Sequence, residues 1–257
     1  MFESIKRQGH ARSLAVLCSL ETRLDRFLQS WLLLAGLACA VRIISAPLTD
    51  GGATLGTITP YVLLIVAPFA STLLALRWFE DADQHAQPST RLAFVGRWRS
   101  IGKNEATAHP LFGTSGIMVS LLVGMLLNVP MRAAEYLAAM PPVPRVAPHW
   151  LSTLHFAMSL DVVLFSSLYM IAFVAALRRA PLFPRLLVAI WTADLAMQLG
   201  TASVVAGTDG LPPAVAESLR GLLEGNAKKV LISAALWLPY LLLSKRVNVT
   251  YRNRVPA

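Results

Sequence analysis

The sequence predicts an all-α protein that crosses a membrane several times as a bundle of helices. Hydrophobic residues make up 55% of the chain and charged residues only 14%, a composition outside the range of ordinary soluble domains. The apolar residues occur in continuous runs and not in the alternation of a membrane β-barrel, so helices are expected. Six runs are long enough to cross a bilayer: 31–48, 61–79, 111–129, 151–177, 186–206, and 230–244 with its flanks.

The basic residues predict which side of the membrane each loop occupies. Seventeen of the 23 Lys and Arg residues lie before the first run, at the end of the second run or between the second and third, between the fourth and fifth, or after the sixth. Because cytoplasmic loops carry such an excess, we expect six transmembrane helices with both termini in the cytoplasm. Trp31 is expected to mark the point where the chain enters lipid. The net charge is +9, but the basic residues are distributed over several loops and form no single basic patch. No nucleic-acid partner is therefore expected.

The runs also divide the chain into segments. Residues 1–30 are expected to form an amphipathic segment on the cytoplasmic membrane surface, and 80–110 a basic cytoplasmic loop. In that loop, Phe94 and Trp98 are expected to dip into the leaflet and bring the surface against anionic lipid headgroups. A short helix over 213–223 is expected to rest on the outer surface. The other segments are two transmembrane helices in 31–79, a membrane domain in 111–251 and a cytoplasmic tail in 252–257.

Small residues recur along the third apolar run at intervals of three and four. Such spacing predicts a smooth helix face against which another helix packs closely. Pro130, at the end of this run, is expected to kink or break the helix. The small residues are Gly113, Gly116, Ser120 and Gly124.

Two acidic residues, Asp161 and Asp194, lie within the fourth and fifth runs, which a short basic turn joins. Both lie near the middle of the membrane, where a charge is costly and needs a partner. Gln198 and Thr201 follow Asp194 at i+4 and i+7, so this side of the helix should face protein or water. Two interpretations stay open. The acids bind a proton or a cation, or they lock helices together through hydrogen bonds.

Other polar side chains are expected nearer the outer surface. His155 points about 120° away from Asp161 at 100° per residue, so the two do not form a dyad by helix geometry alone. A membrane histidine is most often hydrogen-bonded between helices, although it can also titrate. Asn128, Arg132 and Glu135 lie at i, i+4 and i+7. Arg132 and Glu135 are expected to pair or to bind a headgroup at the interface.

No enzymatic motif or cofactor site is apparent in the sequence. The two cysteines, Cys18 and Cys39, offer neither a disulfide framework nor a metal site. The acidic cluster in 80–85 matches no metal-binding loop and is interpreted as a solvated turn. Phosphate-binding glycine loops, zinc-ligand spacings and serine-nucleophile elbows are missing. We therefore assign no catalytic residue, no metal and no cofactor.

The C-terminal part carries a pattern that resembles a known family. The residues that carry it are Trp237, Pro239, Tyr240, Ser244, Arg246, Val247, Thr250 and Tyr251. They are similar to the C-terminal signature of the YdgK-like bacterial inner-membrane domain, over about 111–251. The resemblance implies a four-helix membrane domain in a bacterial inner membrane. That family has no established catalytic residues, so none is carried over.

Three classes of function remain in consideration. The first is a non-enzymatic accessory, assembly or regulatory partner of another envelope component, with the lipid bilayer and another membrane protein as partners. The second is a proton- or cation-coupled small-molecule transporter that uses Asp161 and Asp194. The third is a lipid-modifying enzyme with His155, Arg132 and Glu135 in one water-accessible cavity.

Overall fold

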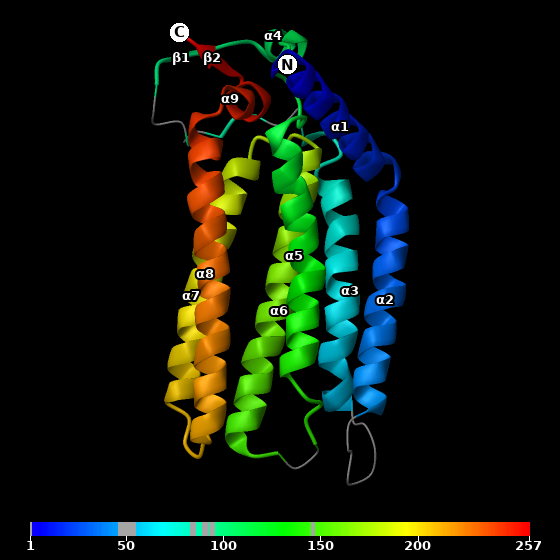
Figure 1. Ribbon diagram of the computed structural model, residues 1–257, viewed down its shortest axis with the longest axis vertical. Helices are drawn as coiled ribbons and strands as arrows, with labels where there is room; N and C mark the ends of the chain where they lie inside the picture. Colours follow the sequence, from blue (N-terminus) through cyan, green and yellow to red (C-terminus); the bar gives the residue numbers. More distant parts are fainter. Residues whose placement is uncertain (1, 46–54, 83–85, 89–91, 93–95, 145–146) are drawn as a thin grey trace.

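The computed structural model describes residues 2–45, 55–82, 86–88, 92, 96–144 and 147–257, and it is an all-α bundle (Figure 1). This confirms the predicted class of membrane helix bundle. Within the described residues, five helices are long and apolar enough to cross a membrane, or six if the bent pair at the C-terminal end counts as one span. The long helices are α2 (Leu24–Ile44), α3 (Leu55–Trp78), α5 (Ile117–Ala139), α6 (His149–Leu177), α7 (Phe183–Ala206) and α8 (Pro213–Leu243).

Helix α6 lies at the centre of the bundle. It packs against α3, α5 and α7, while α2 packs on the outer side of α3 and α8 on α7. Its buried residues include Phe165 and Phe173, and they belong to one continuous apolar core. Helix α6 is covered by other helices on several sides, so its buried polar residues face those helices. It is therefore the central helix of the polar site described below.

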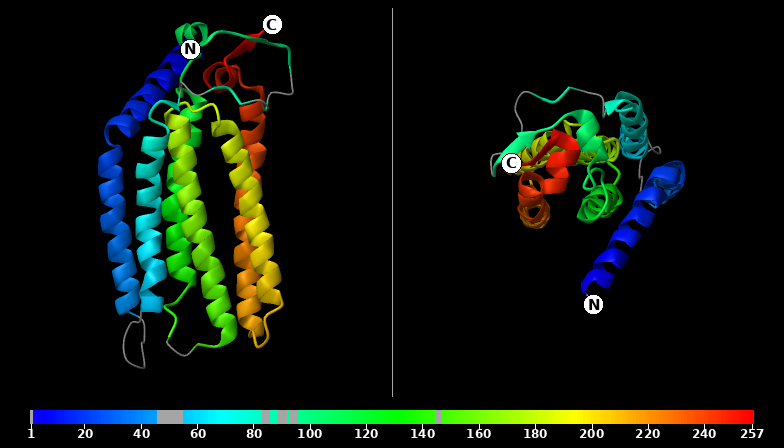
Figure 2. Two further views of the ribbon diagram at one scale, coloured as in Figure 1. Left: turned by 180° about the vertical axis from the view of Figure 1, so that it is seen from behind. Right: turned by 90° about the horizontal axis from the view of Figure 1, so that it is seen from above.

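The short elements gather at the end of the bundle that carries both termini (Figure 2). Helix α1 (Phe2–Thr22) slants across this end, and α4 (Lys103–Ala108) and α9 (Lys245–Arg252) lie at the same end in contact with each other. The strands β1 (Trp98–Ser100) and β2 (Arg254–Pro256) pair in antiparallel register. The expected tail over 252–257 is therefore built into a two-stranded ribbon, because β1 supplies its backbone with hydrogen-bond partners.

Trp98 belongs to this ribbon, opposite Pro256. Phe94, which was expected to enter the leaflet with Trp98, lies outside the described residues, as do residues 83–85 of the acidic cluster. Helix α2 begins at Leu24, about two turns before Trp31, so the entry of the chain into lipid at Trp31 stays a prediction. The Trp31 indole is part-buried, and its Nε1 donates a hydrogen bond to the Ile65 carbonyl at 3.0 Å. This bond joins α2 to α3.

Helix α8 also differs from the expectation. The surface helix over 213–223 and the span that starts near Val230 are one continuous helix of 31 residues. Pro213 occupies its first turn, where a missing N–H costs nothing, and Gly221 and Gly225 weaken the helix without ending it. Leu219 and Leu223 are buried, so this part of α8 packs against the bundle. The lysines at 228 and 229 interrupt the apolar pattern, but the helix continues through them.

The predicted small-residue packing face is wrong. Helix α5 begins at Ile117 and continues through Pro130, so Gly113 and Gly116 precede it, with φ of +102° and +75°. A Cβ added at Gly124 would meet no atom within 4 Å, and Ser120 is exposed. A glycine is therefore required at 116 because the backbone there has a positive φ. No neighbouring helix requires a glycine at 124.

The two glycines should respond in opposite ways to alanine. We expect Gly116→Ala to lower the free energy of unfolding by roughly 1–2 kcal/mol, the cost of a Cβ in the left-handed region. Gly124→Ala should raise it by up to about 1 kcal/mol, because alanine loses less backbone entropy in a helix. Thermal unfolding of the purified variants in detergent measures both. A destabilised Gly124→Ala variant would mean that another helix does approach at this position.

Candidate functional site

Three charged side chains from three helices meet in the interior of the bundle. Arg132 of α5 donates from Nη1 to Asp161 Oδ2 of α6 at 2.8 Å, and from Nη2 to Asp194 Oδ2 of α7. Asp194 is 0% exposed and Asp161 7%. Both aspartates lie about 18 Å along their helices from the end of the bundle opposite the termini, near the middle of each span. The structure thus brings the two intramembrane acids together, with an arginine between them.

Polar neighbours complete this group. Gln198 lies one turn beyond Asp194 on α7 and donates from Nε2 to Asp161 Oδ1 at 2.9 Å and to Asp194 Oδ1 at 3.3 Å. The Tyr169 hydroxyl donates to Asp194 Oδ2 at 3.3 Å. Arg132, Asp161, Asp194 and Gln198 are called the charged cluster below. Every carboxylate oxygen in it accepts at least one hydrogen bond, as buried charges require.

Arg132 is held in its orientation by groups beyond the two acids. Its Nε donates to Asn128 Oδ1 at 3.2 Å, one helical turn earlier on α5. Its guanidinium carbon lies 5.1 Å from the centre of the Phe165 ring and 5.9 Å from that of Tyr169, close enough for cation–π attraction. The planar group is therefore fixed at its edges by hydrogen bonds and on its faces by aromatic rings, an arrangement suited to arginine and not to lysine.

The expected pairing of Arg132 with Glu135 does not occur. Arg132 faces the interior, and Glu135 instead forms an ion pair with Lys229 of α8. The reason is the difference in surroundings. Two buried carboxylates without a cation would be far more costly than one partly exposed glutamate, so the arginine goes to the buried acids. Because α5 continues through Pro130, Arg132 lies well inside the span and not at its outer end.

Two cavities approach the charged cluster from different sides. Arg132 lines one of about 60 Å³ between α5 and α8, which has room for about two water molecules. Its other polar lining residues include Asn128, Tyr169 and Asn226. Gln198 lines a second cavity of about 360 Å³ between α7 and α8. Neither aspartate lines these two cavities, but Arg132, Tyr169 and Gln198, which contact the carboxylates, do.

His155 belongs to a separate polar group. The Tyr136 hydroxyl lies 2.7 Å from Ser159 Oγ and 3.3 Å from His155 Nε2, so the histidine is hydrogen-bonded between α5 and α6. His155 and Ser159 line a cavity of about 820 Å³ between α3 and α6, which is not the cavity that Arg132 and Glu135 line. The lipid-modifying hypothesis needed all three residues in one cavity. The described residues also contain no cluster of side chains that could hold a metal ion.

Residues of the C-terminal signature hold helix α9 in place. Helix α9 turns by 71° from α8, and Ser244 caps it by accepting from the Val247 backbone N–H. The Arg246 guanidinium donates to Ser115 Oγ at 2.8 Å, and the Thr250 hydroxyl accepts from the Gly113 N–H at 3.0 Å. These contacts attach α9 to the segment that leads into α5.

Tyr251 fixes the other side of α9. Its hydroxyl donates to the Ala176 carbonyl at 2.9 Å, and its ring centre lies 5.1 Å from that of Phe183. Burial raises the pKa of this hydroxyl well above its ordinary value, so it remains a donor at any physiological pH. These signature residues therefore hold α9 across one end of the bundle.

Comparisons with known proteins identify the family of the domain that contains the charged cluster. Searches of curated proteins and of solved structures found no match. A protein-family comparison matches residues 113–252, and the matching family is described as "Protein of unknown function (DUF2569)". The match begins and ends close to the limits that the C-terminal signature suggested, but it does not carry the YdgK-like name. Because these residues are more than half of the chain, the protein belongs to the DUF2569 family.

Proposed function

We propose that this chain is a non-enzymatic, multi-pass protein of a bacterial inner membrane that takes up and releases a proton at the charged cluster, as part of proton-coupled transport of a small solute. The observation that carries the proposal is the charge of the cluster. Two carboxylates face one guanidinium inside the bundle. A net charge of one is left over if all three groups are ionised, and this is costly inside a membrane.

A proton removes this excess charge better than a metal cation does. A sodium ion or a similar cation needs several oxygen ligands around a space of its own. The carboxylates of Asp161 and Asp194 instead already accept from Arg132, Tyr169 and Gln198. A proton needs no cavity, so the compact cluster fits a proton best.

The two cavities support access to the cluster. The cavity beside Arg132 has room for about two waters, and the ion pair between Glu135 of α5 and Lys229 of α8 forms part of its lining. The cavity beside Gln198 opens between α7 and α8. A proton that reaches Tyr169 through water is then within one hydrogen bond of Asp194. Helix α8 lines both cavities, so its movement relative to α5 and α7 would alter access to the site.

The topology in this proposal has six transmembrane helices and both termini in the cytoplasm. It is supported by the arrangement of the basic segments. Helix α1, the β1–β2 ribbon, the α6–α7 turn and α9 all lie at one end of the bundle (Figure 1). These are segments in which basic residues gather, as expected for the cytoplasmic side. Helices α8 and α9 then form the last span and its cytoplasmic cap.

Infrared spectroscopy tests the proton site without knowledge of the solute. A pH difference spectrum of the reconstituted protein should show the C=O band of a protonated carboxylic acid. We expect Asp161→Asn and Asp194→Asn each to remove this band, because the remaining carboxylate and Arg132 then form a neutral pair. The same neutral pair should keep the protein folded, which thermal unfolding checks. Asp209→Asn, at an exposed loop position, is the matched control and should keep the band.

Transport is measured next, with the same variants in liposomes that contain a pH-sensitive dye. A potassium gradient with valinomycin drives protons inward, and with a mixture of small solutes supplied outside, the wild-type protein should acidify the lumen faster than protein-free liposomes do. Asp161→Asn and Asp194→Asn should fall to the protein-free rate. A band that persists in both variants would overturn the proton site.

An accessory or assembly role is the second candidate. The observation that favours it is the closed geometry of the cluster, whose acids line neither neighbouring cavity and whose hydrogen bonds tie α5, α6 and α7 together. The two experiments separate the candidates. A carboxylic-acid band without proton flux would favour the accessory role, because the cluster would then bind a proton without moving it.

A further inference from the structure

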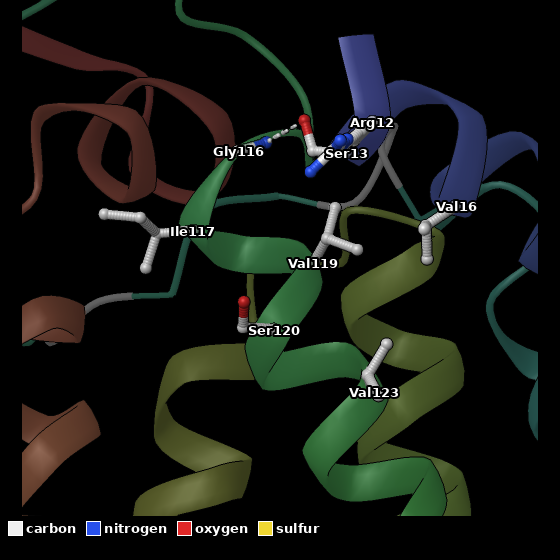
Figure 3. A pocket seen from close by; sticks show the side chains of 8 residues that line it. All are labelled: Arg12, Ser13, Val16, Gly116, Ile117, Val119, Ser120 and Val123. Carbon is white, nitrogen blue, oxygen red and sulfur yellow. Dashed lines mark hydrogen bonds between the residues drawn. The ribbon is translucent and has the colours of Figure 1, made fainter. Parts of the chain in front are cut away.

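A groove separates α1 from the beginning of α5, at the end of the bundle that carries the termini. It has a volume of about 630 Å³ and lies far along the bundle from the charged cluster. Arg12, Ser13 and Gly116 lie at its upper end in Figure 3, where the Gly116 N–H donates to Ser13 Oγ at 3.0 Å. Val16 and Val123 lie below them in the same view.

The upper end of the groove is positively charged. Arg12 is exposed there, and a Cβ added at Gly116 would lie 3.9 Å from Nε of Arg246. None of the residues that line the groove is acidic. Within the described residues, neither arginine forms an ion pair with a carboxylate. The Arg12 guanidinium is thus available to an anionic group at this point, and Arg246, which donates to Ser115 Oγ and does not line the groove, adds positive charge nearby.

Apart from Ser120, the rest of the groove is apolar, and it follows the bundle axis. Val16 is 41% exposed and Ile117 63% exposed. From Ile117 to Val123 the wall extends by about 9 Å along α5. The charged end lies at the membrane interface, where amphipathic helices meet headgroups, and the apolar wall runs toward the hydrocarbon. This order of charges and apolar surface matches one molecule of an anionic phospholipid.

We propose that the α1–α5 groove binds an anionic glycerophospholipid of the bilayer, with its phosphate beside Arg12 and one acyl chain along Val16 and Val123. The groove is formed by a helix from outside the family domain and the first helix inside it. Bound lipid therefore holds α1 against α5. The proposal is independent of the charged cluster.

Native mass spectrometry of the full-length protein in a neutral detergent tests this site. The probes are phosphatidylglycerol and phosphatidylcholine of the same chain length. The wild type should retain phosphatidylglycerol preferentially, and Arg12→Gln should weaken that binding about fivefold, as expected for one basic residue near an anionic phosphate. Val123→Trp should weaken the binding of both lipids, because it fills the apolar wall.

Arg26→Gln is the matched control, since Arg26 is exposed near the start of α2 and does not line the groove. It should leave the binding of phosphatidylglycerol unchanged. Equal losses in Arg12→Gln and Arg26→Gln would show general attraction to anionic lipid and overturn the site. Equal retention of the two lipids by the wild type would overturn the charge selection. Thermal unfolding of each variant confirms that the groove is still folded.

Discussion

Replacing Arg132 with methionine is expected to destabilise the protein more than any other single change in the membrane core. The variant leaves Asp161 and Asp194 buried side by side without a cation, and breaking a buried ion pair in this way costs about 3–5 kcal/mol. For a domain of this size the unfolding temperature should fall by the order of 10 °C. Thermal unfolding of the purified protein in detergent measures the shift.

A neutral version of the same cluster should recover most of the loss. In the triple variant, Arg132→Met is combined with Asp161→Asn and Asp194→Asn, so no buried charge remains and Gln198 can still bond to the amides. Arg220→Met, at an exposed position of α8, is the control and should change the stability by no more than about 0.5 kcal/mol. If Arg132→Met alone were as stable as the wild type, the acids would not depend on the arginine and the assigned geometry would be wrong.

Removing the side chain of Tyr251 is expected to have the second largest effect. The ring is buried between α9 and Phe183, and its loss should lower the free energy of unfolding by about 3–5 kcal/mol, as for other buried aromatic residues. Helix α9 should then detach from the bundle. Limited trypsin digestion detects this, because the chain next to Lys245 and Arg246 would become accessible to the protease.

Tyr251→Phe provides the graded control for this experiment. It keeps the ring and removes only the hydrogen bond to Ala176, so the expected loss is about 1 kcal/mol and the trypsin pattern should be unchanged. If Tyr251→Ala and Tyr251→Phe had equal effects, the assignment of Tyr251 as a packing residue would be contradicted. The stabilisation would instead be assigned to the hydroxyl alone.

The intramembrane acids could be recognised from the sequence, but their arginine could not. Asp161 and Asp194 stand out because an acid within a long apolar run is rare and needs a partner. Arg132 lies after Pro130, and a proline is ordinarily taken as the end of a helix. Because α5 continues through that proline, the arginine is carried into the bundle, and sequence spacing alone favoured the neighbouring Glu135.

The extent of α8 was misjudged for a related reason. Apolar periodicity measures where a helix meets lipid or protein, not where its backbone ends. The lysines at 228 and 229 interrupt the apolar run, yet both have high helix propensity, and the helix continues through them. The β1–β2 ribbon was also missed, because three-residue strands carry no usable alternation and their pairing joins residues far apart in the chain.

The sequence by itself determined that the chain is a helical membrane bundle, and it indicated the two buried acids. These properties are local, since a run of apolar residues or an isolated charge can be seen within one helix. Only the tertiary structure decided the partners: Arg132 for Asp161 and Asp194, Lys229 for Glu135, and the α1–α5 groove. The physical reason is that a buried charge selects its partner by the cost of leaving other groups unpaired, and this cost depends on which helices pack together.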